Sequence, residues 1–515
     1  MPAINNDPLT LIKAAYNAGP IDARSFLPPE LAKGFFTQQG DQLVGLQAYD
    51  LAPVAAVLYP VMTPLRNRIP RVTGGFNIQS NWKAITGINT TNQRAGISEG
   101  NRSGFIEHTT ADYLANYRGY GLDSYVTFEA DFASATFADL KSLAVSQLLQ
   151  SVMIQEERMD LGGNTSVPLG VTPTPSLAAS AGNGTIPGGT ALSVICVALG
   201  PQAYLDVAGH NNGVLGVAFN PTTVQVPGRI TRDNANGTHE TFNGGSAQKS
   251  AAATITPGAT GSVTATVTPV RGAWGYAWFA GPAGQERLAA ISTSATAVIK
   301  DTNTVGQLAS ALPAEDCSCS HLEYDGLFTQ AAKPGSHAYW KALPNGAALT
   351  SDGAGGITEF EAAFLDFYNL YRISPSLILV SARECVDITR LIIGNGGAPL
   401  IRFNADANSI ANGSITAGVS IGAYLNKVMG TQVPIVVHPN LAPGTVFFLT
   451  ESQNMPYPLP ATANVFQKRL RRDYYQMDWP LTKRQHEYGV YADGVLQHFA
   501  PFSMGVITNI TSPQG

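Results

Sequence analysis

The chain has 515 residues, of which only 13% are charged, and it contains 52 glycines and 33 prolines. Its formal net charge of −5 argues against a protein that grips nucleic acid electrostatically, because such proteins are normally basic. The length predicts several domains, and the glycine and proline content predicts many turns and strands. A mean hydropathy of +0.02 is high for so little charge, so we expect other subunits to cover part of the apolar surface.

The N-terminal sequence MPAINNDPLT has neither a basic nor an apolar signal-peptide region, so no secretion signal is expected. No apolar run approaches the roughly 18 residues of a transmembrane helix, which predicts no membrane partner. Cys317 and Cys319 are too few for a zinc site without further ligands in range, and with Cys196 and Cys385 they are expected to be reduced thiols. We therefore expect no metal and no cofactor.

Residues 1–75 have the pattern of an extended arm with one short helical candidate, Leu9–Asn17. Prolines 53, 60, 64 and 70 exclude a long helix or a central strand from the apolar stretch 51–72, so this segment is expected to run over another surface. Three basic residues in it are candidates for ion pairs between subunits, with a solvated cluster as the equal alternative: Arg66, Arg68 and Arg71.

Residues 76–133 predict a long two-stranded loop with a flexible tip. Phe76, Ile78 and Trp82 alternate with polar residues, which indicates a half-buried strand over 76–85. A return strand is expected over 122–130, after a polar, glycine-rich segment. Such a hairpin is marginal alone and is expected to lie on a neighbouring subunit, with Trp82 and Lys83 as candidate interface residues.

The segment Thr136–Asn164 predicts a long helix with one broad apolar stripe, formed by Leu140, Ala144, Leu148 and Val152. Thr136 is a plausible N-cap, and the Gly162–Gly163 pair is a stop signal. The pattern places Glu157 on the opposite, polar side. No catalytic residue is expected on this helix, and three charged residues near its end are candidate interface residues: Glu156, Glu157 and Arg158.

Residues 168–312 predict an inserted β-sandwich. Charge is sparse, and short alternating runs are separated by turns at 191–199, 250–258, 261–270, 275–281 and 295–301. Trp274, Tyr276 and Trp278 are its predicted core aromatics. The pattern resembles a fibronectin type III or immunoglobulin-like module.

Residues 313–515 mix helix and strand. Two capping boxes, Thr358-x-x-Glu361 and Ser381-x-x-Glu384, predict helix starts. Strands are expected at 377–380, 419–424, 432–437, 445–449 and 504–510. The Asp493–Gly494 pair between two alternating runs predicts a hairpin turn.

Two short motifs resemble those of enzymes. Gly418-Val-Ser420-Ile-Gly422 matches a nucleophile elbow, but no helix start follows it, so a hydrolase is disfavoured. Gly394–Gly397 follows a helix instead of a strand, which excludes a dinucleotide fingerprint. We expect no enzyme activity.

The densest positive stretch, 467–472, offers three further candidate interface residues: Arg469, Arg471 and Arg472. It either faces packaged nucleic acid or pairs with acidic groups of a neighbouring subunit. Alternation along a strand divides these charges between two faces, which favours the subunit interface.

The order of arm, long loop, helix and mixed body, with the segments LAPVAAVLYPVMTPLRNRIPRV, LILVSARECVDITRLII and VPIVVHP, resembles the major capsid protein of tailed double-stranded DNA bacteriophages. This HK97-like capsid fold, which encapsulins share, is of the α+β class. The resemblance implies an N-terminal arm (1–75), an extended loop (76–133), the spine helix of the peripheral domain (134–167), an inserted sandwich (168–312), and the rest of the peripheral domain with the axial domain (313–515).

The resemblance implies a structural protein that forms hexamers and pentamers of an icosahedral shell around double-stranded DNA, without sequence-specific binding. It implies a scaffolding protein and a portal as partners, a virion capsid location, and assembly in the bacterial host cytoplasm. The sandwich is expected on the outer surface, and deletion of 168–305 is expected to leave assembly intact. The alternatives are a virion surface or tail adhesion protein and an encapsulin-like compartment shell.

Overall fold

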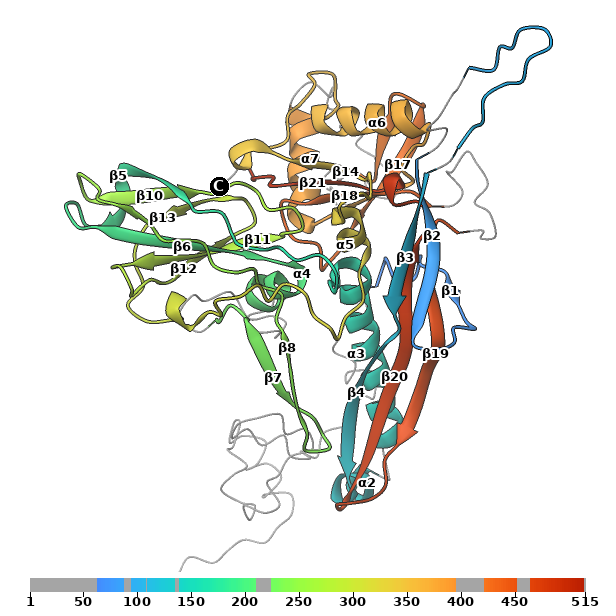
Figure 1. The fold of residues 1–515 in the computed structure, drawn as a ribbon. Coiled ribbons are helices and arrows are strands. Elements are labelled where there is room, and N and C mark those ends of the chain that lie inside the picture. The colour runs from blue at the N-terminus through green and yellow to red at the C-terminus, as the bar shows by residue number, and fades with distance from the viewer. Residues whose placement is uncertain are drawn as a thin grey trace, which may run out of the picture. The chain divides into compact units, whose positions relative to one another are not determined.

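The computed structural model of the protein describes residues 63–87, 94–107, 109–134, 139–209, 224–394, 421–451 and 464–513. This part of the chain contains both helices and strands, which confirms the predicted mixed α+β content (Figure 1). The chain divides into two compact units. The described part of the smaller one is 122–134 and 139–150 with 476–490, and the other described residues form the larger one. The predicted helix Leu9–Asn17 and the motif serine Ser420 lie outside the described residues.

A six-stranded sheet forms the centre of the larger unit. Its strands follow the order β14 (Tyr339–Ala342), β21 (Gly505–Thr508), β18 (Val446–Leu449), β15 (Leu377–Val380), β17 (Thr431–Val437) and β16 (Ala423–Asn426). The helices α5 (Leu327–Ala332), α6 (Thr358–Tyr371) and α7 (Ala382–Gly394) belong to the same unit. Phe360, Phe364 and Phe367 of α6 all meet the ring of Phe448 of β18. These edge-to-face aromatic contacts join helix to sheet in the main core.

Of the two predicted capping boxes, the one at the start of α7 is present in part and the one at the start of α6 is absent. Ser381 and Glu384 form one half of the predicted capping box, since the Glu384 N–H donates to the serine hydroxyl at 3.5 Å, while the Glu384 carboxylate accepts from that same hydroxyl. The first box is wrong. The helix α6 begins at Thr358, and Glu361 instead accepts a 2.9 Å hydrogen bond from the hydroxyl of Tyr424.

The predicted hairpin turn at Asp493–Gly494 is also wrong, because β20 runs without a break over Gln485–His498. A tight hairpin turn of that kind needs positive φ at its central residues, and neither residue has it. The Asp493 carboxylate pairs instead with Arg471 of β19 (Phe466–Asp478) at 2.9 Å. This cross-strand ion pair uses the aspartate as an ordinary strand residue.

The strands β2 (Gln79–Gly87) and β3 (Thr109–Asn116) form the predicted two-stranded ribbon, with Trp82 opposite Tyr113. The return strand was predicted too late in the chain. Residues 118–127 form β4 (Arg118–Thr127) of a different sheet, and α2 (Phe128–Ser134) follows. Trp82 is buried as expected, with its indole N–H bonded to the carbonyl of His498, but Phe76 and Ile78, which precede β2, are 80% and 69% exposed.

Another sheet has four strands, in the order β1 (Arg71–Val72), β19, β20 and β4. The strands β1 and β19 are parallel and place Arg71 opposite Lys468. The long helix α3 extends over Leu140–Gly162, so it ends at the predicted glycine. Its observed N-cap is Asp139, whose carboxylate accepts the N–H groups of Lys141 and Ser142, whereas Thr136 lies outside the described residues.

Two further sheets lie within residues 176–299 (Figure 1). One contains β13 (Thr296–Ile299), β10 (Gly261–Thr266) and β5 (Ser176–Ile186), and the other contains β12 (Arg287–Ser292), β11 (Gly275–Gly281), β6 (Leu192–Leu199) and β9 (Ala253–Ile255). Cys196 and Trp278 face a core shared by the two sheets. The alternate residues Val197 and Phe279 belong instead to the main core with Phe360. The β6–β11 sheet is therefore buried on both faces, and the domain boundaries at 168 and 312 stay a prediction.

The remaining short elements complete the larger unit. They are α4 (Pro201–Tyr204), η3 (Leu205–Gly209), β7 (Arg229–Asp233), β8 (His239–Asn243), η4 (Ala309–Ala311), η5 (Pro344–Gly346) and η7 (Pro501–Ser503).

Candidate functional site

The C-terminal half of α3 carries a row of buried carboxylates. Glu156 and Asp160 are one helical turn apart, so they project from the same face, and Glu157 lies beside them. All three side chains are fully buried. The predicted exposure of Glu157 on a polar face is wrong, because the acidic groups meet basic and N–H partners from segments distant in sequence.

Lys468 of β19 enters this cluster from the sheet. Strand alternation turns Lys468 and Leu470 inward, and the lysine is 1% exposed. Its Nζ donates hydrogen bonds to Oε1 of Glu156 at 2.5 Å and to Oδ1 of Asp160 at 2.9 Å. The rings of Tyr120 and Tyr324 flank the same nitrogen at 4.9 Å and 4.8 Å. The lysine is therefore held between two carboxylates and two aromatic rings.

The arm residues Arg66 and Arg71 complete the surroundings of Glu156. Arg66 Nε lies 2.7 Å from Oε2, and Arg71 Nη1 lies 2.6 Å from Oε1. The hydroxyls of Tyr120 and Tyr474 also donate to this carboxylate. Both arginines thus form intramolecular ion pairs that fix residues 63–72 against α3.

The electrostatic environment separates the two helix carboxylates. Burial raises the pKa of Glu156, but the charges of Lys468 and Arg71 outweigh it and hold that pKa at about 2. At Asp160, burial prevails over the attraction of Lys468 and raises the pKa to about 6. Of these two carboxyl groups, Asp160 therefore takes up a proton more readily.

Glu157 binds the arm through its backbone. Its carboxylate accepts the N–H of Leu65 at 2.9 Å and the N–H of Arg66 at 2.6 Å. Nε2 of His438 lies 2.7 Å from the same carboxylate, and His438 Nδ1 accepts the N–H of Asn440. This pattern assigns the imidazole proton to Nε2, since Nδ1 acts as an acceptor.

The other predicted interface residues also have partners within the chain. Arg158 pairs with Asp206 at 2.7 Å, and Arg68 pairs with Glu451 at 3.1 Å. Further contacts join Trp82 to the carbonyl of His498, Lys83 to Asp112, Arg469 to the carbonyl of Gly74, Arg471 to Asp493, and Arg472 to the ring of Tyr475. Some of these residues, such as Lys83 and Arg472, are exposed. A role at a subunit interface stays a prediction.

Sequence reasoning missed six members of the cluster: Tyr120, Asp160, Tyr324, His438, Lys468 and Tyr474. Only one signal was available for them. Glu156 and Asp160 lie four residues apart at the end of an apolar helix, so their like charges repel each other unless a cation lies between them. Nothing in the sequence indicated which cation this would be.

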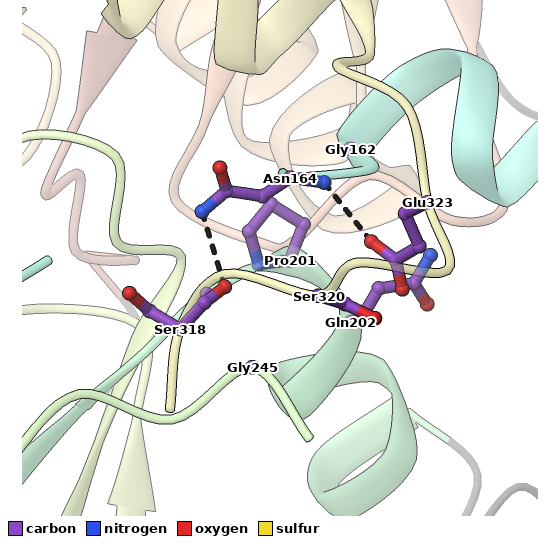
Figure 2. Close-up of a pocket in the computed structure, with 9 residues that line it drawn as sticks. Gly162, Asn164, Pro201, Gln202, Gly245, Ser318, Ser320 and Glu323 are labelled. Carbon is purple, nitrogen blue, oxygen red and sulfur yellow. Dashed lines mark hydrogen bonds between the residues drawn. The ribbon is translucent and has the colours of Figure 1, made fainter. Parts of the chain in front are cut away.

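A small pocket lies where the chain leaves α3 (Figure 2). Asn164 donates from its backbone N–H to Glu323 at 2.9 Å and from its amide to the carbonyl of Ser318 at 3.1 Å, as Figure 2 shows. Burial raises the pKa of Glu323 to about 7. Gly162, Gly200 and Gly245 line the pocket together with Ser318 and Ser320, and the two hydrogen bonds of Asn164 fix the chain at the end of the helix.

Within the described ranges, no group of three or more His, Cys, Asp or Glu side chains is placed to hold a metal ion. Among those same residues, no helix combines the length and the apolar character needed to cross a membrane.

No protein-family model and no curated protein matches this sequence. Solved structures similar to the chain include the capsid asymmetric unit of cyanophage A-1(L), with 10% identity, coverage of 94% of this chain and 98% of that one, and a TM-score of 0.37. The capsid of a native GTA particle shows 6% identity, coverage of 96% and 99%, and a TM-score of 0.35. The encapsulin of Synechococcus elongatus PCC 7942 shows 14% identity, coverage of 37% and 58%, and a TM-score of 0.19. These neighbours are shell proteins, but TM-scores this low do not establish a shared fold.

Proposed function

We propose that this chain is a shell-forming structural protein, the major capsid protein of a tailed double-stranded DNA phage. One observation carries the proposal. The β2–β3 ribbon, the residues just before it and its connection present large apolar side chains to water. Phe76 and Ile78 precede β2, Ile97 and Ile106 lie in the connection, and Leu114 lies in β3. A partner chain is the natural cover for such a surface.

The energetics of the ribbon favour an intermolecular contact. A two-stranded ribbon is marginally stable alone. Ile78 and Leu114 are 69% and 65% exposed, and full burial of such side chains contributes about 1.5–3 kcal/mol each. Binding to a different surface on an identical chain is a heterologous contact, and repetition of such contacts closes rings and shells.

The arm supports the same proposal. Glu156 and Glu157 fix residues 63–72 on α3, so the segment that precedes the ribbon has a defined path. The order of arm, ribbon, long helix and mixed body agrees with the sequence resemblance described above. The net charge of −5 suits a wall that encloses DNA without gripping it.

The full proposal includes hexamers and pentamers in an icosahedral head, a scaffolding protein, a portal, and outward display of the 176–299 sandwich. Its test is the size of the assembly. The chain is expressed in bacteria with and without its neighbouring genes, and then analysed by sedimentation and negative-stain microscopy. Closed shells are expected. A monomer or trimer that stays small with all neighbours present would refute the proposal and favour an adhesion protein. Shells that enclose protein cargo would favour an encapsulin-like compartment.

A further inference from the structure

The contact between Lys468 and Asp160 places an amino group next to a carboxyl group in the interior of the protein. The Lys468 Nζ lies 2.9 Å from Oδ1 of Asp160, and both side chains are removed from water. Oδ1 also accepts a hydrogen bond of 2.5 Å from the hydroxyl of Tyr324. Oδ2 of the same carboxyl group is buried and has no hydrogen-bond partner among the described residues. The two oxygens of Asp160 are therefore in different environments, one stabilised and one unpaired.

We propose that Lys468 and Asp160 join through an amide bond inside the folded chain. The inference concerns this cluster alone and holds whether or not the chain builds a shell. An amine and a carboxyl group held at hydrogen-bond distance react with a large advantage over the same groups in solution, because the entropy of bringing them together has been lost during folding.

The step needs no oxidant and no cofactor. A proton passes from the Lys468 ammonium to the Asp160 carboxylate, which leaves a neutral amine beside a carboxylic acid. The Nζ lone pair then attacks Cγ, and the negative charge that develops on Oδ1 is stabilised by the Tyr324 hydroxyl. Nζ gives up a second proton, which Glu156 passes on to the hydroxyl group at Oδ2; the C–Oδ2 bond then breaks, and Oδ2 leaves with both protons as one water molecule. Oδ1 remains as the oxygen of the new amide.

Glu156 is placed to relay the second proton. Its Oε1 lies 2.5 Å from Nζ, within direct hydrogen-bond reach. Burial favours the protonated form of Asp160 by raising the pKa of that group to about 6. The rings of Tyr120 and Tyr324 help to exclude the water that would otherwise reverse the reaction.

The test is the mass of the purified full-length chain, measured after denaturation. We expect the wild-type protein to be lighter than its Lys468→Arg variant by the difference between the residues plus one additional water. Comparison with the variant removes any effect of N-terminal processing. Digestion is expected to yield a branched peptide in which the Lys468 side chain is attached to Asp160.

Two further variants sharpen the result. Glu156→Gln removes the proton relay and is expected to abolish most of the mass deficit in freshly purified protein. Lys83→Arg is the matched control, because Lys83 faces Asp112 at 3.8 Å on the exposed ribbon, and it is expected to leave the deficit unchanged. Folded wild-type protein with the full mass of its sequence and no branched peptide would overturn the proposal, and this outcome does not depend on whether any variant folds.

Discussion

Nε2 of His438 lies 2.7 Å from Oε1 of Glu157, and both side chains are completely buried. The same carboxylate accepts the N–H groups of Leu65 and Arg66. One glutamate therefore connects the arm, the long helix and a loop of the body. Groups that serve so many buried partners are costly to remove, because each partner is left without a hydrogen bond.

The first prediction concerns this glutamate. Glu157→Ala is expected to lower the free energy of unfolding by about 3 kcal/mol or more, since two backbone N–H groups and an imidazole lose their acceptor. Urea denaturation measures the loss, and proteolysis near residue 65 reports release of the arm. Glu129→Ala, which removes an exposed ion pair with Arg484, is the control and is expected to cost under about 1 kcal/mol. Equal stability of the two variants would contradict this account.

The second prediction concerns acid stability. Burial lowers the pKa of His498 to about 3 from its ordinary value of 6.5. Between these two pH values His498 is protonated in the unfolded chain but neutral in the folded chain. The free energy of unfolding therefore falls as the pH drops, and His498 contributes roughly 1.4 kcal/mol per pH unit to this fall. Asn at this position retains an acceptor for the N–H of Ala500 and does not titrate.

Urea midpoints of wild-type protein and His498→Asn, measured between about pH 7 and about pH 4, test this cause. The variant is expected to lose less stability over this range. Parallel curves would show that the acid sensitivity comes from other groups.

The third prediction concerns the 176–299 sheets. Deletion of 168–305 looked harmless from the sequence, but Val197 and Phe279 pack in the main core. Deletion is now expected to give insoluble protein, because it uncovers the apolar body beneath. Phe279→Ala alone is expected to cost about 3–5 kcal/mol in a denaturant titration. The exposed residue Val298 supplies the control variant, Val298→Ser. A soluble, folded deletion variant would show that the body closes without these sheets.

The fourth prediction concerns the ribbon. The double variant Ile78→Ser and Leu114→Ser is expected to keep the unfolding midpoint of the wild type, because both side chains are largely exposed. It is expected to reduce assembly at least tenfold, as measured by sedimentation. Val298→Ser again serves as the control, since it alters an apolar side chain of similar exposure outside the ribbon. Unchanged assembly of the double variant would place the subunit contact elsewhere.

Local pattern was sufficient where a segment is bounded by turns. The run 275–281 was predicted as a strand, and β11 has those limits, because glycine marks both ends and the residues between favour strands. Local pattern failed where a distant partner decides. The pair Asp493–Gly494 is of a type common in hairpin turns, yet it lies within the continuous strand β20, where Asp493 pairs with Arg471.

The candidate site shows the same division. Periodicity predicted the helix and its end, but it assigned Glu157 to solvent, since a charged residue on a helix normally faces water. Its actual partners are residues 65, 66 and 438. Sequence spacing gave no means of pairing positions so far apart, and the basic run at 467–472 did not reveal which of its basic residues is buried, namely Lys468.

The cluster around Glu156 also constrains the order of events during synthesis. Its cations come from Arg66 and Arg71 near the beginning of the chain and from Lys468 near its end. A ribosome must translate beyond Tyr474 before every partner of this carboxylate exists. Until then Glu156 can pair only with the arginines of the arm and with Tyr120. The full set of contacts that fixes the arm on α3 is therefore complete only after β19 has been made.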